Sequence, residues 1–192
     1  MELKQTDHSG VTWNYPMPGD SALINKAVDF ATAKHHGQSR KDEANTPYIN
    51  HPVSLANLLS GHGGITDINV ILAALLHDTI EDTDATAEEI EDMFGTAIKN
   101  IVLEVTDDKS LPSPVRKRLQ IEHASSLSYE ARLVKLGDKI CNLQDILARP
   151  PATWSLQRKR EYFDWAREVV DQLRGTHAGL EAMFDEIYEN KP

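Results

Sequence analysis

A continuous apolar run, Val70-Ile71-Leu72-Ala73-Ala74-Leu75-Leu76, constrains the fold of this chain more than any other segment. Apolar residues occupy nearly every side of a helix formed by this run, so it predicts a central, buried helix. We expect the helix to extend over about residues 67–80. The run ends at His77 and is much shorter than the roughly 18 apolar residues that a membrane-spanning helix requires. No membrane segment or membrane partner is therefore expected.

Helical patterns also account for most of the remaining sequence. A first helix is expected over about residues 21–36, and Pro52 begins a second helix at a position that tolerates proline. Thr86 and Glu89 have the spacing of a capping box, which predicts the start of a short helix. Further helices are expected over about residues 96–105, 114–124, 128–147, 155–173 and 177–189. Because no segment has the alternation of a strand, we predict an all-α bundle of about 8–10 helices.

The first twenty residues differ from the rest of the chain. Residues 1–20 contain Pro16 and Pro18 and lack apolar periodicity, which predicts an irregular N-terminal arm. Residues 21–192 are enough for one domain with a sizeable core and too few for two. The arm lacks the apolar segment of a secretory signal, so a cytoplasmic location is expected.

The net charge of −10 bears on which partners the chain can bind. Nucleic-acid binding depends on clustered Lys and Arg, so nucleic acid is not an expected partner. A small anionic substrate remains compatible with this charge if basic residues gather locally, although each basic residue can equally be a solvated surface group. The candidates for such a lining are Arg40, Lys41, Arg116, Lys117, Arg118, Lys135 and Lys139.

Polar residues follow the buried helix directly, in the order His77-Asp78-Thr79-Ile80-Glu81-Asp82. On one continuous helix, His77, Asp78 and the acidic pair would span an arc of roughly 140°, so all four side chains would face one cavity. This arrangement suits two metal ligands followed by two carboxylates that handle water. A helix end that becomes polar on reaching solvent explains the His-Asp pair alone equally well.

Two further residues favour a metal site. His51 precedes a predicted helix, and Asp138 interrupts the apolar pattern of another. A buried Asp requires a partner, and a divalent cation is a suitable one. Because Cys141 is the single cysteine of the sequence, a metal would have to be held by imidazole and carboxylate groups.

The order His51, His77-Asp78, Asp138 matches the pattern of HD-domain phosphohydrolases. Longer blocks resemble the hydrolase domain of the RelA/SpoT family, and within it the stand-alone small alarmone hydrolases of the metazoan SpoT-homologue type. These blocks are residues 27–35, 46–52, 73–83, 105–109, 135–139 and 162–166. The resemblance covers the chain from about residue 21 to the C-terminus.

The resemblance implies hydrolysis of the 3′-diphosphate of ppGpp and pppGpp, which releases pyrophosphate and leaves GDP or GTP. The implied metal ligands are His51, His77, Asp78 and Asp138. The implied metal is Mn²⁺, and the ligand types also suit Zn²⁺ or another divalent cation. Glu81 and Asp82 match the acidic pair that positions and activates the attacking water in hydrolytic family members.

The resemblance also implies contacts to the guanine nucleotide. Arg40, Lys41 and Tyr48 match the loop around the base, Asn142 a residue beside the metal and ribose, and Tyr162 a distal contact. Lys139 is a weaker candidate for the diphosphate. By residue type alone, the two tyrosines can equally be aromatics at the edge of the core.

Three questions stay open in the sequence. The same scaffold would support a phosphatase or pyrophosphohydrolase on another nucleotide such as NADPH, or a catalytically silent nucleotide sensor. The oligomeric state is not predicted. Gly137 stands where the family usually has alanine, and we expect close packing against the metal site to explain a glycine that costs a helix up to about 1 kcal/mol.

Overall fold

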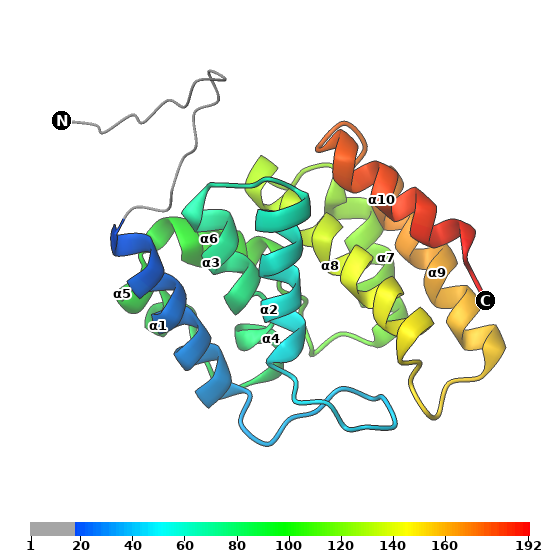
Figure 1. Ribbon diagram of the computed structural model, residues 1–192, viewed down its shortest axis with the longest axis horizontal. Coiled ribbons are helices and arrows are strands. Elements are labelled where there is room, and N and C mark those ends of the chain that lie inside the picture. Colours follow the sequence, from blue (N-terminus) through cyan, green and yellow to red (C-terminus); the bar gives the residue numbers. More distant parts are fainter. Residues whose placement is uncertain (1–17) are drawn as a thin grey trace, which may run out of the picture.

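The structure is a computed structural model that describes residues 18–192, and its regular elements there are helices (Figure 1). The only β pairing in this range is an isolated bridge between Ser39 and Pro47, so the all-α prediction is confirmed. The helices are α1 (Pro18–Lys34), α2 (Asn50–Asn57), the π-helical turn η1 (Leu58–His62), α3 (Ile68–Leu76), α4 (Thr79–Asp82), α5 (Ala87–Phe94), α6 (Thr96–Val105), α7 (Ser113–Ala124), α8 (Tyr129–Ala148), α9 (Leu156–Asp171) and α10 (Ala178–Glu189). None of the helices in residues 18–192 has the length and hydropathy needed to cross a membrane.

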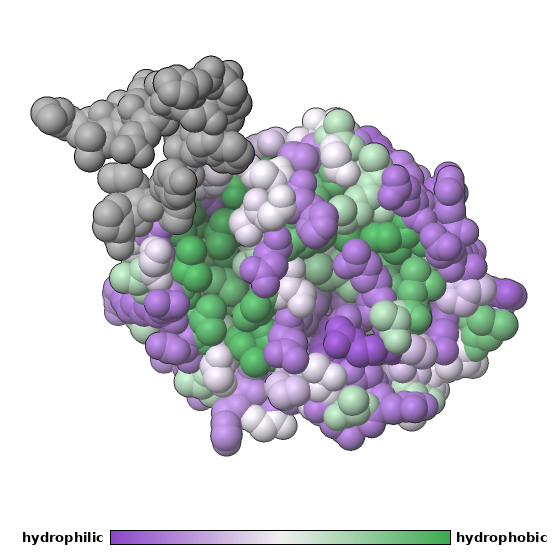
Figure 2. Space-filling model, viewed as in Figure 1, coloured by the Kyte–Doolittle hydropathy of each residue, from purple (hydrophilic) through white to green (hydrophobic). Residues whose placement is uncertain are grey.

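Helix α3 lies at the centre of its half of the bundle, where α1, α2, α6 and α8 pack around it (Figure 1). All residues from Val70 to Leu76 are buried, which confirms the central helix expected from the apolar run. On the face shown in Figure 2, hydrophobic side chains gather beside α1 and on the side of α8 and α10. Hydrophilic side chains cover much of the rest of that face.

The helix expected over residues 67–80 is wrong in one respect, because it is broken in two. Helix α3 ends at Leu76, and Asp78 adopts φ −98° and ψ −3° before α4 begins. Two side chains form hydrogen bonds with carbonyl oxygens in the last turn of α3. The His77 ring bonds Ala74 O at 2.9 Å, and the Thr79 hydroxyl donates to Leu76 O at 2.7 Å. Such side-chain bonds compete with the helical amides, so the chain turns at this point.

The boundary of the predicted N-terminal arm also differs. Helix α1 begins at Pro18, because proline is well tolerated in the first turn of a helix. Residues 18–20 therefore belong to α1, and residues 1–17 of the predicted arm lie outside the described part of the chain.

Gly137 allows α8 to approach α2 and η1 closely. A Cβ at this position would lie 2.6 Å from Leu55 Cδ1 and 3.0 Å from Leu59 Cδ2. The expectation that packing against the metal site explains this glycine is wrong, because its close neighbours are these two leucines. The tight contact fixes the distance between the helices one residue before Asp138.

We expect Gly137→Val to lower the free energy of unfolding by about 1–3 kcal/mol, because its side chain overpacks the contact with Leu55 and Leu59. Urea denaturation followed by circular dichroism measures the change. Gly61→Val in η1 is the matched control, since a Cβ at Gly61 meets no atom within 4 Å. Equal stabilities of the two variants would contradict this packing argument.

Candidate active site

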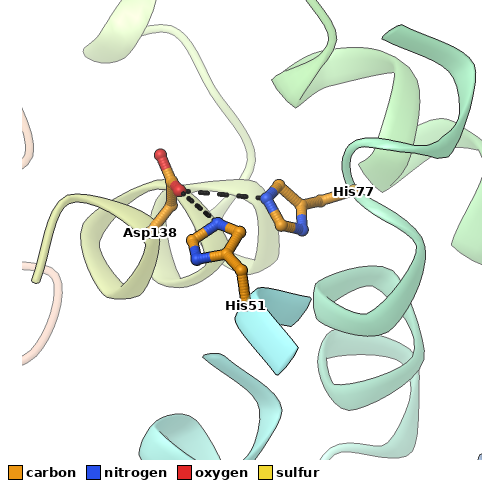
Figure 3. Close-up of side chains that lie close together, drawn as sticks. All are labelled: His51, His77 and Asp138. Carbon is orange, nitrogen blue, oxygen red and sulfur yellow. Dashed lines mark hydrogen bonds and ion pairs between the residues drawn. The ribbon is translucent and has the colours of Figure 1, made fainter. Parts of the chain in front are cut away.

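Three separate elements bring the predicted His and Asp residues together, and Figure 3 shows His51, His77 and Asp138 of this group. His51 lies in the first turn of α2, His77 and Asp78 in the turn between α3 and α4, and Asp138 in the middle of α8. Asp138 Oδ1 lies 3.1 Å from His51 Nε2 and 3.8 Å from His77 Nε2. The two histidines and Asp138 each offer a ligand atom within 4.8 Å of the others. Asp78 Oδ2 completes the group, 3.0 Å from His77 Nε2 and 3.9 Å from His51 Nε2.

The orientation of the His77 ring suits a metal ligand. Its Nδ1 bonds the Ala74 carbonyl oxygen, which can only accept, so Nδ1 carries the hydrogen. The buried Nε2 atom faces the carboxylates of Asp78 and Asp138. A histidine that binds a metal through one ring nitrogen usually donates a hydrogen bond from the other, often to a backbone carbonyl.

The charges of this group call for a cation at its centre. Burial opposes protonation of His77, but the negative charges of Asp78 and Asp138 outweigh it and raise its pKa to about 9. Burial likewise raises the pKa of Asp138, yet Lys139 and the histidines hold that pKa well below its usual value. Two imidazoles and two carboxylates are a donor set that Zn²⁺ and Mn²⁺ accept. The residues therefore fit a divalent cation.

Asp138 is held from two more sides. Asn142 Nδ2 donates to Asp138 Oδ1 at 2.6 Å, and Lys139 Nζ lies 3.1 Å from Asp138 Oδ2. Lys139 is 3% exposed, and its ammonium lies 4.5 Å from the centroid of the Trp165 ring. Both residues were predicted as nucleotide contacts, and both also fix the carboxylate at the centre of the group.

The acidic pair lies on the short helix α4. Glu81 Oε2 accepts a hydrogen bond from the Asp107 amide at 2.9 Å, and Arg116 Nη1 lies 3.4 Å from Glu81 Oε1. Burial raises the pKa of Glu81, although the Asp107 amide acts in the opposite direction. Asp82 forms an ion pair with Lys109. A half-buried carboxylate with a raised pKa beside this group is suited to accept a proton from water.

Two adjoining cavities meet at this group. The smaller one, of about 240 Å³, contains His77, Asp78, Glu81 and Asp138 in its lining. Its basic lining residues are Arg40, Arg116, Lys117, Lys135 and Lys139. Arg118 is not among them, because it is exposed and pairs with Glu122 at 3.4 Å.

The larger cavity, of about 570 Å³, collects the residues predicted around the base. Its lining includes Arg40, Lys41, Tyr48, Asn142 and Tyr162. It shares Arg40, Tyr48, His51, Asp82, Asn142 and Tyr162 with the smaller cavity. The loop between α1 and α2 and the C-terminal end of α8 form this region, where Figure 2 shows strongly hydrophilic side chains.

Side chains that the sequence analysis did not single out complete the two cavities. Trp154 lines the larger cavity, with its ring centroid 5.5 Å from that of Tyr162. Asp145 Oδ2 accepts a hydrogen bond from Arg40 at 2.7 Å. Asp107 and Lys109 come from the loop that follows α6. Loop residues carry no periodic signal, so only the matching block at residues 105–109 pointed to the last two.

The all-α bundle and the buried His-Asp group beside an acidic pair define a class of proteins, the metal-dependent HD hydrolases. A protein-family model described as "HD domain" matches residues 27–164. Guanosine-3′,5′-bis(diphosphate) 3′-pyrophosphohydrolase MESH1 of Xenopus tropicalis is 56% identical to this chain over 172 residues, which cover 90% of this chain and 96% of the relative. The chain belongs to this MESH1 family of HD-domain proteins, as its resemblance to the RelA/SpoT hydrolases predicted.

Other relatives agree with that assignment. The Homo sapiens MESH1 pyrophosphohydrolase is 49% identical over 175 residues, which cover 91% of this chain and 98% of the relative. A solved structure described as "A metazoan ortholog of SpoT hydrolyzes ppGpp and plays a role in starvation responses" superposes with a TM-score of 0.87 at 47% identity. That alignment covers 93% of this chain and 98% of the other.

Proposed function

We propose that this chain is a guanosine-3′,5′-bis(diphosphate) 3′-pyrophosphohydrolase that converts ppGpp or pppGpp to GDP or GTP and pyrophosphate. The observation that carries the proposal is that one cavity joins the His-Asp group, Glu81 and a basic lining. A cation centre, a proton acceptor and positive charge for a diphosphate are the parts that such a hydrolysis requires. The names and near-complete coverage of the MESH1 relatives support the choice of substrate.

His51, His77, Asp78 and Asp138 would hold the divalent cation, and Mn²⁺ is the ion we propose. When bound, the cation lowers the pKa of water and offsets negative charge on the phosphoryl oxygens. The basic residues of the smaller cavity oppose the charge of the 3′-diphosphate. Arg116 and the Asp107 amide hold Glu81 at the edge of that cavity.

Glu81 accepts a proton from the attacking water. The water oxygen forms a bond to the nearer phosphorus of the 3′-diphosphate, and the bond between that phosphorus and the ribose 3′ oxygen breaks. The 3′ oxygen takes a proton from solvent, pyrophosphate leaves, and Glu81 returns its proton to solvent. Asp82 lies beside Glu81 on α4 and completes the acidic pair that orients the water. The reaction needs no covalent nucleophile, which agrees with the burial of Cys141.

The larger cavity would hold the guanosine part of the substrate. Arg40 lies 5.8 Å from the centroid of the Tyr48 ring, and a guanidinium can stack on a purine as it does on an aromatic ring. Trp154 and Tyr162 offer further aromatic surface, and Lys41 adds an exposed positive charge at the rim. We propose that the enzyme acts in the cytoplasm on this small nucleotide.

Anion-exchange separation of products tests the reaction. With ppGpp and Mn²⁺, the protein is expected to release intact pyrophosphate and GDP, and EDTA is expected to abolish the release. Parallel reactions with NADPH and with plain guanine nucleotides are expected to run more slowly. Release of single phosphates, or faster turnover of NADPH, would reject the proposed reaction in favour of a phosphatase on another nucleotide.

A further inference from the structure

Tyr48 contacts the acidic residues of the site through its hydroxyl. This hydroxyl donates to Asp78 Oδ2 at 2.5 Å and lies 3.3 Å from Asp82 Oδ2. A phenol has one proton to donate, and its ordinary pKa near 10 keeps that proton in place at neutral pH. The shorter contact therefore takes the proton, so the hydroxyl donates to a proposed metal ligand and lies next to a member of the acidic pair.

The Tyr48 ring is itself held in place. His35 stacks on it, with ring centroids 4.6 Å apart and an angle of 28° between the planes. His35 is 4% exposed, so this stacking lies inside the protein. The Tyr48 amide also donates to the Gln38 carbonyl at 3.1 Å, which closes the loop between α1 and α2 on itself. Few rotations remain that would carry the hydroxyl away from Asp78.

Gln38 connects the same loop to α4. Its Nε2 donates to the Asp82 carbonyl at 2.8 Å, so its Oε1 faces His35 Nδ1 at 2.9 Å. Because Oε1 can only accept, His35 Nδ1 carries the hydrogen of this bond. A chain of donors thus runs from His35 through Gln38 to the backbone of α4.

We infer that Tyr48 is a positioning residue for the reaction: its hydroxyl fixes the Asp78 carboxylate, His35 holds its ring, and Gln38 fixes α4 through the Asp82 carbonyl. This inference rests on the proposed function, because it concerns the proposed metal ligand and acidic pair. It changes the role expected for Tyr48, since a hydroxyl that already donates its proton to Asp78 is not free to donate it to the base. Partners of metal ligands typically contribute about 10- to 100-fold in metal affinity or activity.

Tyr48→Phe tests the inference because it keeps the ring and its stacking on His35 but removes the hydroxyl. We expect Mn²⁺ to bind about 10-fold more weakly in calorimetric titration, and kcat for ppGpp to fall about 10- to 100-fold. The KM for ppGpp is expected to stay within about twofold of the parent. Tyr188→Phe is the matched control, because Tyr188 also donates to a carboxylate, that of Asp164 at 2.8 Å, away from the site.

The outcomes separate this inference from the proposed function. Unchanged Mn²⁺ affinity in Tyr48→Phe with a raised KM would overturn it, since the hydroxyl would then contact substrate. Unchanged affinity, kcat and KM would also overturn it. A parent protein that binds Mn²⁺ but does not hydrolyse ppGpp would reject the proposed function, whereas the two Mn²⁺ titrations would still decide the role of Tyr48. Circular dichroism melting of both variants checks that they are folded.

A second variant tests the connection to α4. Gln38→Met keeps the approximate length of the side chain and removes its bonds to His35 and to the Asp82 carbonyl. We expect kcat to fall by about 10-fold, with Mn²⁺ affinity within about twofold of the parent. An unchanged kcat would overturn the part of the inference that concerns Gln38.

Discussion

Asp138→Asn is expected to abolish metal binding and ppGpp hydrolysis together. The Asp138 carboxylate faces both histidines of the group, and asparagine has nearly the same shape without the charge. Loss of a charge next to a divalent cation removes several kcal/mol of transition-state stabilisation. Each 1.36 kcal/mol of that stabilisation corresponds to a factor of ten in rate. We therefore expect kcat/KM to fall by about a thousandfold or more, measured by release of pyrophosphate, with Mn²⁺ binding followed by calorimetry.

The control for Asp138→Asn is Asp171→Asn, which removes a carboxylate from an exposed ion pair with Arg174. Exposed ion pairs contribute little to the stability of the fold, so this variant is expected to match the parent in activity and metal binding. Asp138→Asn also leaves the buried Lys139 ammonium without its charge partner, so some loss of stability is expected. Full activity in a folded Asp138→Asn protein would remove Asp138 from the proposed metal site.

Glu81→Gln is expected to lower kcat by about 10²- to 10⁴-fold, because an amide cannot accept the proton of the attacking water. The amide oxygen can still accept the hydrogen bond from the Asp107 amide, while the contact of the other oxygen with Arg116 is lost. Mn²⁺ affinity and the KM for ppGpp are expected to change by less than about twofold. Steady-state kinetics combined with metal titration measures the three quantities.

Glu168→Gln, at an exposed position on α9, is the matched control for Glu81→Gln and should behave as the parent. If the parent bound ppGpp without hydrolysing it and Glu81→Gln bound it equally well, the chain would be a nucleotide sensor. If Glu81→Gln were fully active, another group would have to accept the proton.

The helices that could be predicted best are those whose signals are local. The segment expected over residues 96–105 is α6 with the same bounds. The capping box at the start of α5 is present, with Glu89 N donating to Thr86 Oγ1 at 3.2 Å and Thr86 N to Glu89 Oε2 at 3.0 Å. Apolar periodicity and a capping box involve residues within one or two helical turns of each other, so both can be recognised in the sequence without knowledge of the fold.

The break between α3 and α4 could not be predicted in the same way. The residues from His77 to Asp82 fit a helical arc, and the turn arises because His77 and Thr79 bond backbone carbonyls of α3. Whether such side chains bond the backbone or point to solvent depends on their surroundings. The turn nevertheless keeps His77, Asp78, Glu81 and Asp82 in the lining of one cavity.

The remaining parts of the site are contacts between segments far apart in the sequence. Trp154 and Asp107 line the cavities from loops, where neither apolar periodicity nor a capping motif indicates which way a side chain points. The neighbours of Gly137 are leucines of α2 and η1, although the metal site was the nearest feature in sequence. Distances between helices depend on packing across the whole bundle, which local patterns do not contain.

The convergence of three elements on the proposed cation site has a thermodynamic consequence. His51 and Asp138 are separated by 87 positions in the chain, and they meet only when α2 and α8 have packed together. A cation bound there would bind the folded state and not the unfolded chain, so folding and metal supply would be linked. At free metal 100-fold above its dissociation constant, the linkage stabilises the folded state by about 2.7 kcal/mol. The abundance of folded enzyme would then depend on the concentration of free metal around it.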